Sequence, residues 1–321
     1  IGYFVNFRQI LLSAHQKKYI VTAYFQTANI VKTVVQILVA LYATNLYVWV
    51  AIELSFGILY AFILNWKIDQ HYPWLQASVK RGALEHTNYP IIITKTKQVF
   101  VHKFKDFLLN QSDQILVFAF VSLKMVAYYG NYVMVVSKLT MLFTTTLDGM
   151  FASVGNLIAE NNQRKIQQVF WELVCVRFYV GGVVVFCVYH LVEPFISLWL
   201  GPQYILDQSV LILLMVSTFI LLTRGAVDMF NAGYGNYGDL WAAWVELAIC
   251  LTVTVLTAPK WGVIGILLGK IFSLIPIGMI WKPMYLYKAG FQLPFKSYWK
   301  SIFFYYCACG VSFALVHYVT R

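Results

Sequence analysis

Long apolar stretches separated by short polar segments run along almost the whole of this chain. A membrane-spanning helix needs about 20 apolar residues, because the hydrocarbon core is roughly 30 Å thick and a helix rises about 1.5 Å per residue. The pattern predicts spanning helices at about 20–43, 45–66, 107–128, 131–155, 169–191, 206–231, 239–258, 262–282 and 298–319. It therefore predicts an all-α, polytopic helical membrane protein.

Composition agrees with this fold class. Hydrophobic residues make up 60% of the chain and charged residues 12%, with a mean hydropathy of +0.68. An ordinary globular domain is about a quarter charged. The opening stretch from Tyr3 to Ala14 is about half a span long and lacks the basic start and cleavage site of a signal peptide. We interpret it as a helix cut at the N-terminus, and Arg321, just past a span, is compatible with a second truncation.

Lys and Arg residues between the predicted spans gather on one face, and such residues stay on the cytoplasmic side during insertion. That face receives Lys17, Lys18, Lys67, Lys80, Arg81, Lys95, Lys97, Lys103, Lys105, Arg164, Lys165, Lys282, Lys288, Lys296 and Lys300. The other face holds Lys260 and Arg321. The turn at Pro194–Tyr204 is then extracytoplasmic. The net charge of +11 is mostly loop charge near anionic headgroups and needs no nucleic acid partner.

The long segment 67–106 divides the chain into two predicted parts. It mixes basic residues with aromatic ones, which predicts an amphipathic cytoplasmic loop at the membrane surface; a regulatory site is the alternative. Before it, residues 1–66 form the remainder of an N-terminal lobe. After it, residues 107–284 form a six-helix C-terminal lobe, and residues 285–321 hold an additional C-terminal transmembrane helix.

A weak internal repeat supports a two-lobe arrangement. Residues 14–63 overlay residues 232–281, and both copies run out through one span and back through the next. Identical residues are Ala14 and Ala232, Tyr19 and Tyr237, Val35 and Val253, Ala40 and Ala258, and Ser55 and Ser273. The shared orientation indicates a parallel repeat about an axis along the membrane normal, with a cavity between the lobes.

Four cations within apolar stretches are candidates for substrate binding. Arg8, Arg177 and Arg224 lie at similar depth above the cytoplasmic surface, and Lys270 lies in the outer half. A charge at mid-helix costs about 2.5–3.5 kcal/mol on insertion scales, so each needs a reason. Arginine forks bind phosphate oxygens bidentately, so we interpret the arginines as lining a water-filled cavity for an anionic headgroup. Structural ion pairs or snorkelling are the alternative.

Four further residues are candidates for coupling or gating. Lys32 and Glu53 share one depth on consecutive helices, which predicts a structural or gating ion pair. Asp113 is a candidate relay for a coupling ion, with helix pairing as the alternative, and Asp228 lies at a shallower position. Pro276, in mid-span, predicts a kink, or a hinge for lobe motion.

Motifs for metal, cofactor or covalent chemistry are absent from the sequence. The five cysteines fall within predicted spans, and the six histidines are scattered without metal-ligand spacing. There is no glycine-rich phosphate loop and no nucleophile elbow. The short outward loops leave no room for an extracytoplasmic catalytic domain within these residues. The sequence therefore predicts neither a metal, nor a cofactor, nor an enzyme.

Four short strings occur in order along the chain: Ser112–Leu116, Tyr128–Tyr132, Ala152–Leu157 and Pro194–Gly201. They resemble, in turn, the start of the seventh helix, the following outer turn, the end of the eighth helix and the ninth-to-tenth connection of the polysaccharide-unit flippases. These Wzx-like transporters belong to the multidrug/oligosaccharidyl-lipid/polysaccharide exporter superfamily. Each string is weak alone, whereas their order and spacing together are fairly specific.

The resemblance implies an exporter-type bundle of two six-helix lobes that rock about a central cationic cavity in the bacterial cytoplasmic (inner) membrane. The implied cargo is an undecaprenyl-diphosphate-linked oligosaccharide, driven by a proton or sodium gradient. Its diphosphate would engage cavity arginines, and a polysaccharide polymerase and chain-length proteins would be partners. A drug/cation antiporter of the same superfamily and an integral-membrane enzyme of polysaccharide assembly are the alternatives.

Overall fold

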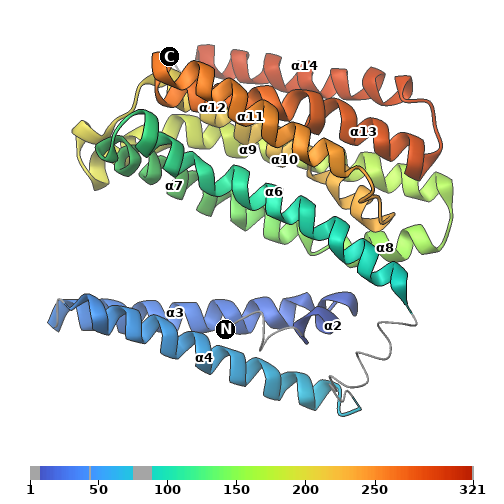
Figure 1. Cartoon of the computed structure of the whole chain (residues 1–321), viewed down its shortest axis with the longest axis horizontal. Helices are drawn as coiled ribbons and strands as arrows, with labels where there is room; N and C mark the ends of the chain where they lie inside the picture. The colour runs from blue at the N-terminus through green and yellow to red at the C-terminus, as the bar shows by residue number, and fades with distance from the viewer. Residues whose placement is uncertain (1–7, 43–44, 75–88, 320–321) are drawn as a thin grey trace. The chain divides into compact units, whose positions relative to one another are not determined.

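The computed structural model describes residues 8–42, 45–74 and 89–319. Within these ranges the secondary structure is helical and contains no strand (Figure 1). Six of the described helices are long and apolar enough to cross a membrane: α3 (Lys18–Tyr42), α4 (Leu46–His71), α9 (Gln163–Trp199), α10 (Gln208–Gly233), α11 (Leu240–Trp261) and the continuous helix Val263–Phe291. The expected all-α, polytopic helical membrane fold is confirmed.

Residues 1–88 form one compact unit, here called the N-terminal unit. It consists of α2 (Gln9–Ala14) and the paired helices α3 and α4, and the side chain of Asn45 accepts a hydrogen bond from the amide of Tyr47 to cap α4. The small core of this unit lies at one end of the pair and contains Leu12, Leu64 and Ile68. Most other apolar side chains of α3 and α4 are exposed, as suits helices that face lipid or further helices.

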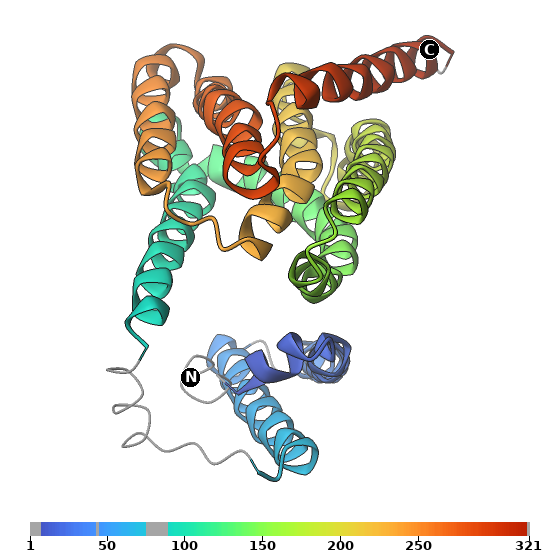
Figure 2. The same ribbon diagram turned by 90° about the vertical axis from the view of Figure 1, so that its right-hand side faces the viewer.

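Residues 89–321 form the second compact unit, the C-terminal unit. Besides α9, α10 and α11 it contains α6 (Pro90–Phe120), α7 (Leu123–Asp148), α8 (Phe151–Ala159), the 3₁₀ turn η1 (Pro202–Tyr204), α12 (Val263–Ser273), the π-helical η2 (Leu274–Trp281), α13 (Lys282–Tyr285), the π-helical η3 (Leu286–Phe291) and α14 (Lys296–Val319). Helix α10 is central and packs against α8, α9 and α12, as Figure 2 also shows.

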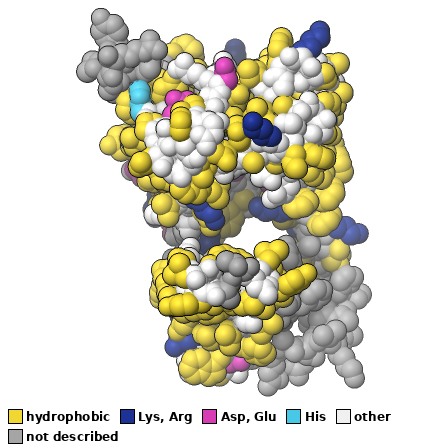
Figure 3. Space-filling view, turned by 90° about the vertical axis from the view of Figure 1, so that its left-hand side faces the viewer, with side chains coloured by type: hydrophobic (Ala, Val, Ile, Leu, Met, Phe, Trp, Pro, Cys, Tyr) yellow, Lys and Arg dark blue, Asp and Glu magenta, His cyan; other side chains and the backbone are white. Residues whose placement is uncertain are grey.

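Two apolar clusters hold the C-terminal unit together. One joins α6, α7, α9, α10 and α12 around Tyr132, Ile196 and Leu267. The other joins α8, α9, α10, η3 and α14 around aromatic rings, with Phe170 packed edge-on against Phe230 and Phe291. Outside these clusters, hydrophobic side chains cover much of the visible surface of each unit (Figure 3).

Helices α11 and α12 approach each other closely because α12 presents glycine at two positions four residues apart. A Cβ atom on Gly265 would lie 2.5 Å from the backbone of Thr257 and Ala258. One on Gly269 would meet the side chain of Thr254 and the carbonyl of Cys250. Small residues at this spacing let helix backbones pack tightly inside membranes. The spacing fixes α12 against α11 and so places the charged side chains described below.

Several predicted boundaries are wrong. Helix α6 ends at Phe120, and Ser122 caps α7 by accepting a hydrogen bond from the amide of Met125. The chain therefore turns at 121–122, and the string Tyr128–Tyr132, expected as an outer turn, is helical. A break at Gly149–Met150 separates α7 from α8, so the predicted span 131–155 is not one helix.

The predicted turn Pro194–Tyr204 and the predicted loop 67–106 also contain helix. Pro194 lies inside α9, which runs on to Trp199, and the turn comes at Gly201, whose φ of +109° suits glycine. Residues 90–106 form the first half of α6, begun by Pro90, and residues 67–71 end α4. Residues 75–88 of the predicted loop lie outside the described residues. Its cytoplasmic location stays a prediction.

Candidate functional site

Charged side chains line up between α6, α10, α11 and the α12–α13 segment of the C-terminal unit. We call this set the charge column. Its cations are Lys105, Arg224, Lys270 and Lys282, and its carboxylates are Asp106, Asp113, Asp228, Asp239 and Glu246. Three of its helices, α10, α11 and Val263–Phe291, are able to span a membrane. The column is thus a nearly balanced set of charges.

Helix periodicity explains how α6 contributes to the column. Its buried residues are Lys105, Leu109, Asp113 and Val117, each four positions after the one before. Residues four apart lie on one face of a helix, so charged and apolar side chains alternate along a single buried stripe. On α10, Arg224 and Asp228 have the same spacing and form an ion pair at 2.8 Å.

Glu246 of α11 joins two cations in the middle of the column. Its Oε2 lies 2.8 Å from Nζ of Lys105, and its Oε1 lies 3.6 Å from Nη1 of Arg224. The side chain of Glu246 is only 2% exposed. The cavity beside this group has a volume of about 40 Å³ and is also lined by Asn110 and Ser273. It has room for water but not for a lipid headgroup, so the column is closed in this conformation.

One end of the column is an ion pair between α6 and α12. Nζ of Lys270 lies 2.9 Å from Oδ2 of Asp113, and the hydroxyl of Tyr129 on α7 donates to the same oxygen at 3.4 Å. Both Asp113 and Tyr129 are buried. A single carboxylate therefore ties three helices together, and the loss of its charge would release Lys270 from its partner.

The other end of the column centres on Asp239, which precedes α11. Its carboxylate accepts hydrogen bonds from Nε1 of Trp281 at 3.0 Å and from Lys282, whose Nζ lies 2.8 Å from Oδ2. Nε2 of His102 on α6 lies 3.3 Å away. Burial alone would raise the pKa of Asp239, but His102 and Lys282 outweigh it, so the pKa falls below its ordinary value.

Arg177 lies outside the column. Its Nη2 is 2.9 Å from Oδ1 of Asp148, and its guanidinium packs where Gly225 leaves space on α10. Arg224 belongs to the lining of the small polar cavity, whereas Arg177 does not. This structure places only Arg224 at the small polar cavity, so a cavity shared by both arginines stays a prediction. Arg177 contacts α10 at position 225, and side chains at adjacent positions 224 and 225 point about 100° apart on a helix. A similar depth in the sequence therefore does not mean that Arg177 and Arg224 lie on the same face.

In the N-terminal unit the predicted pair of Lys32 and Glu53 is present at 2.7 Å, and Gln36 also donates to Glu53 at 3.1 Å. Arg8 forms an ion pair with the exposed Asp69 at 2.6 Å. The roles of these residues in gating or substrate binding stay predictions.

All four predicted substrate-binding cations thus have carboxylate partners, and the column itself holds one more carboxylate than Lys and Arg side chains. The expected cationic cavity between the lobes stays a prediction. Sequence reasoning missed Lys105, Asp239 and Lys282 because it counted them as loop charges or passed over them. The four-residue spacing on α6 was the available signal for Lys105.

Metal-binding chemistry finds no support in the described residues, where no group of three or more His, Cys, Asp or Glu side chains could hold an ion. The site is instead a set of ion pairs that joins α6 to three helices long and apolar enough to cross a membrane. The chain is a multi-pass helical membrane protein whose architecture fits a membrane transporter. Comparison with protein-family models, curated proteins and solved structures finds no match to this chain.

Proposed function

We propose that this protein flips an undecaprenyl-diphosphate-linked oligosaccharide from the cytoplasmic to the outer leaflet of a bacterial cytoplasmic membrane, for envelope polysaccharide synthesis. The observation that carries the proposal is the charge column. Ionisable residues inside membrane bundles mark the paths of substrates, ions and protons, because each is costly to bury. The resemblance of four sequence strings to polysaccharide-unit flippases supplies the class of cargo.

Arg224 and Lys270 are the residues that we assign to the diphosphate. Each now faces carboxylate oxygens, and phosphate oxygens are ligands of the same charge and kind. The incoming diphosphate would exchange with the carboxylates. Arg177 and Arg8 pair elsewhere, so the proposal does not rest on them.

This exchange also supplies a coupling step. When the diphosphate takes Lys270, Asp113 is left as a buried carboxylate without its cation. An unpaired buried charge is unstable, so Asp113 takes up a proton or a sodium ion. Release of the cargo restores the Lys270 pair and returns the ion. Cargo and ion are then linked through one carboxylate.

Opening of the column requires a moving element, and η2 is the candidate. Pro276 lies within this π-helical segment, which directly follows α12. A Cβ on Gly278 would lie only 3.0 Å from Nη1 of Arg224, so η2 lies directly against the column. Departures from α-helix within membrane helices are frequent at functional sites. The expected kink at Pro276 coincides with this change of helix type.

Complementation tests the proposal. The full-length protein is expressed in a bacterial strain that lacks its own flippase, and surface polysaccharide is measured. Arg224→Ala and Lys270→Ala should each abolish polymer, whereas Arg224→Lys, which keeps charge but loses the planar fork, should retain part of it. Lys165→Ala removes an exposed pair with Glu160 and is the matched control. Normal polymer from the Arg224→Ala, Lys270→Ala double variant would contradict the proposal.

A drug/cation antiporter is the second candidate, and the carboxylate excess of the column favours it. Buried carboxylates such as Asp113 and Glu246 can bind an organic cation. In that case expression would lower accumulation of ethidium in cells, Asp113→Asn would restore it, and surface polysaccharide would not depend on the protein.

A further inference from the structure

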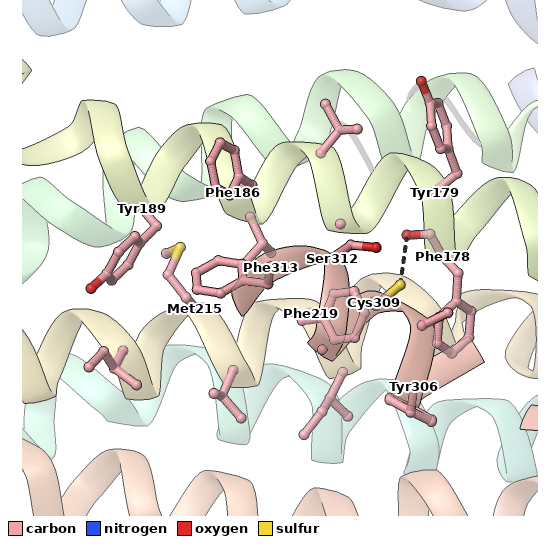
Figure 4. A pocket seen from close by; sticks show the side chains of 18 of the residues that line it. Phe178, Tyr179, Phe186, Tyr189, Met215, Phe219, Tyr306, Cys309, Ser312 and Phe313 are labelled. Atoms are coloured by element: carbon pink, nitrogen blue, oxygen red, sulfur yellow. Dashed lines mark hydrogen bonds between the residues drawn. The ribbon is translucent and has the colours of Figure 1, made fainter. Parts of the chain in front are cut away.

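A second cavity, apart from the charge column, lies between α9, α10, the α12–η2 segment and α14 (Figure 4). Its volume is about 1060 Å³. The residues that line it are aliphatic, aromatic or small, and none of them carries a charge. We call this cavity the apolar groove. It shares no lining residue with the small cavity beside Glu246.

Aromatic contacts close the apolar groove at both ends (Figure 4). At one end the ring of Tyr306 on α14 lies 4.9 Å from that of Phe178, measured between centroids. At the other end Phe313 lies 5.7 Å from Phe186 and 5.6 Å from Tyr189. Helix α14 therefore touches α9 through rings separated by about two turns of helix.

Small side chains leave the space between these two contacts. Helix α14 carries Ala308, Gly310 and Ser312 there, and α9 carries Gly182 opposite. A Cβ on Gly310 would have no other atom within 4 Å, and one on Gly182 would lie 3.9 Å from Sγ of Cys309. The groove is thus a consequence of small residues placed between large rings.

The surroundings of the groove determine what can fill it. Its walls include three helices that are able to span a membrane, and exposed lining residues such as Val183, Val216 and Ile275 open it to the outside of the unit. Apolar walls offer water too few hydrogen bonds, and an empty space of this size loses dispersion contacts on every side. Around the apolar part of a membrane-spanning helix the solvent is hydrocarbon.

We propose that the apolar groove binds one hydrocarbon chain of a bilayer phospholipid, which lies between the two aromatic contacts and completes the packing of α14 on α9 and α10. Phospholipid is the most abundant source of hydrocarbon in a bilayer. The lining has no charged group that would select a particular headgroup and only a few hydroxyls. This binding is independent of the cargo proposed above.

Photocrosslinking tests the inference. The purified full-length protein is placed in nanodiscs of phosphatidylethanolamine and phosphatidylglycerol that contain a phosphatidylethanolamine with a mid-chain diazirine. After irradiation, adducts are mapped by mass spectrometry. We expect them to concentrate on residues 178–189 and 306–313 rather than on the equally apolar exposed faces of α3 and α4.

A groove-filling variant gives the discriminating result. Gly310→Phe places a ring in free space and should reduce adducts at these two segments severalfold. Gly155→Phe in α8 is the matched control, because a Cβ there also has no other atom within 4 Å, and it should keep wild-type adducts. Should Gly310→Phe fail to fold, Gly182→Leu fills the same groove from α9.

Three results would overturn the inference. Adducts that Gly310→Phe leaves unchanged, or that spread evenly over all exposed apolar helices, would show that the groove is not a site. A polyprenyl phosphate with the same diazirine that labels the groove in preference to the phospholipid would assign it to another lipid. Crosslinks between two copies of the chain through α14 would assign it to a protein interface.

Discussion

The two units of this protein each contain a Lys–Glu ion pair of almost the same length in different surroundings. In the N-terminal unit, Lys32 and Glu53 lie 2.7 Å apart with side chains 17% and 54% exposed. In the C-terminal unit, Lys105 and Glu246 lie 2.8 Å apart with side chains 6% and 2% exposed. The distance between charges therefore says little about what each pair does.

The difference lies in connectivity as well as burial. Lys32 and Glu53 join consecutive helices of one hairpin. Lys105 and Glu246 join helices far apart in sequence, and Glu246 also faces Arg224, which pairs with Asp228. Removal of one partner has local consequences in the first case. In the second it alters the charge balance around neighbouring ion pairs as well, in a site that little solvent reaches.

The largest expected effect is that of Glu246→Leu, which removes the buried carboxylate shared by Lys105 and Arg224 and leaves these cations with only Asp106 and Asp228, which are partly exposed. Breaking a buried pair from one side costs about 3–5 kcal/mol, so the yield of folded protein in detergent should collapse. Glu172→Leu removes an exposed carboxylate of α9 and should leave that yield unchanged. Equal yields from the two variants would show that Glu246 is not buried among these cations.

A large steric effect is expected where α11 and α12 touch. Gly269→Leu forces a side chain into Thr254 and the carbonyl of Cys250. Such overpacking lowers the free energy of unfolding by about 1–3 kcal/mol or more, so the melting temperature should fall. Gly57→Leu on α4 is the control, because a Cβ there has no other atom within 4 Å. If both variants melt alike, α11 and α12 are not in close contact.

The lowered pKa of Asp239 predicts that its contribution to stability depends on pH. Its pKa is lowered in the folded protein, so its ionised form contributes stability that is fully present above the unfolded value of about 4. That contribution is lost as pH falls through the lower folded value. The melting-temperature difference between wild type and Asp239→Asn should therefore be constant near neutral pH and shrink below about pH 4. A difference that grows on acidification would contradict the assigned direction.

The smallest effect is expected from the exposed pair. Lys32→Met and Glu53→Leu should each lower the folded yield less than Glu246→Leu does, because Glu53 is half exposed, and in Lys32→Met the side chain of Gln36 still donates to Glu53. The double variant should recover part of either loss. Strictly additive losses would show that the two side chains do not interact in the folded protein.

This contrast also explains what the sequence could reveal. Lys32 and Glu53 were predictable because they lie at one depth on consecutive helices, so pairing needs no knowledge of the fold. The partners of Lys105 and Lys270 come from helices more than 100 residues away, and only packing brings them together. Arg177 shows the same limit. Its position along the sequence predicts the same depth as that of Arg224, but in the structure it pairs with Asp148 and packs against a different face of α10.

Helix ends were predictable where apolar runs stop and not where a polar cap interrupts one. Helix α10 lies close to its predicted range because its apolar run is bounded by Asp207 and Gly233. The break at Ser122 was not predicted, because the turn was placed between the predicted spans 107–128 and 131–155, where Tyr128–Tyr132 resembles an outer turn, and this string is helical. The pair of Gly265 and Gly269 was visible in the sequence and would have predicted the tight α11–α12 contact.

The central claim is that the charge column serves transport and not only folding. The most direct measurement replaces Asp113 with Asn and Lys270 with Met together, which removes the pair without stranding a charge and keeps a partner for Tyr129. A purely structural pair tolerates such a neutral replacement. We predict folded yield and membrane level close to wild type, with surface polysaccharide lost in the complementation assay. Normal polysaccharide from this double variant would contradict the claim.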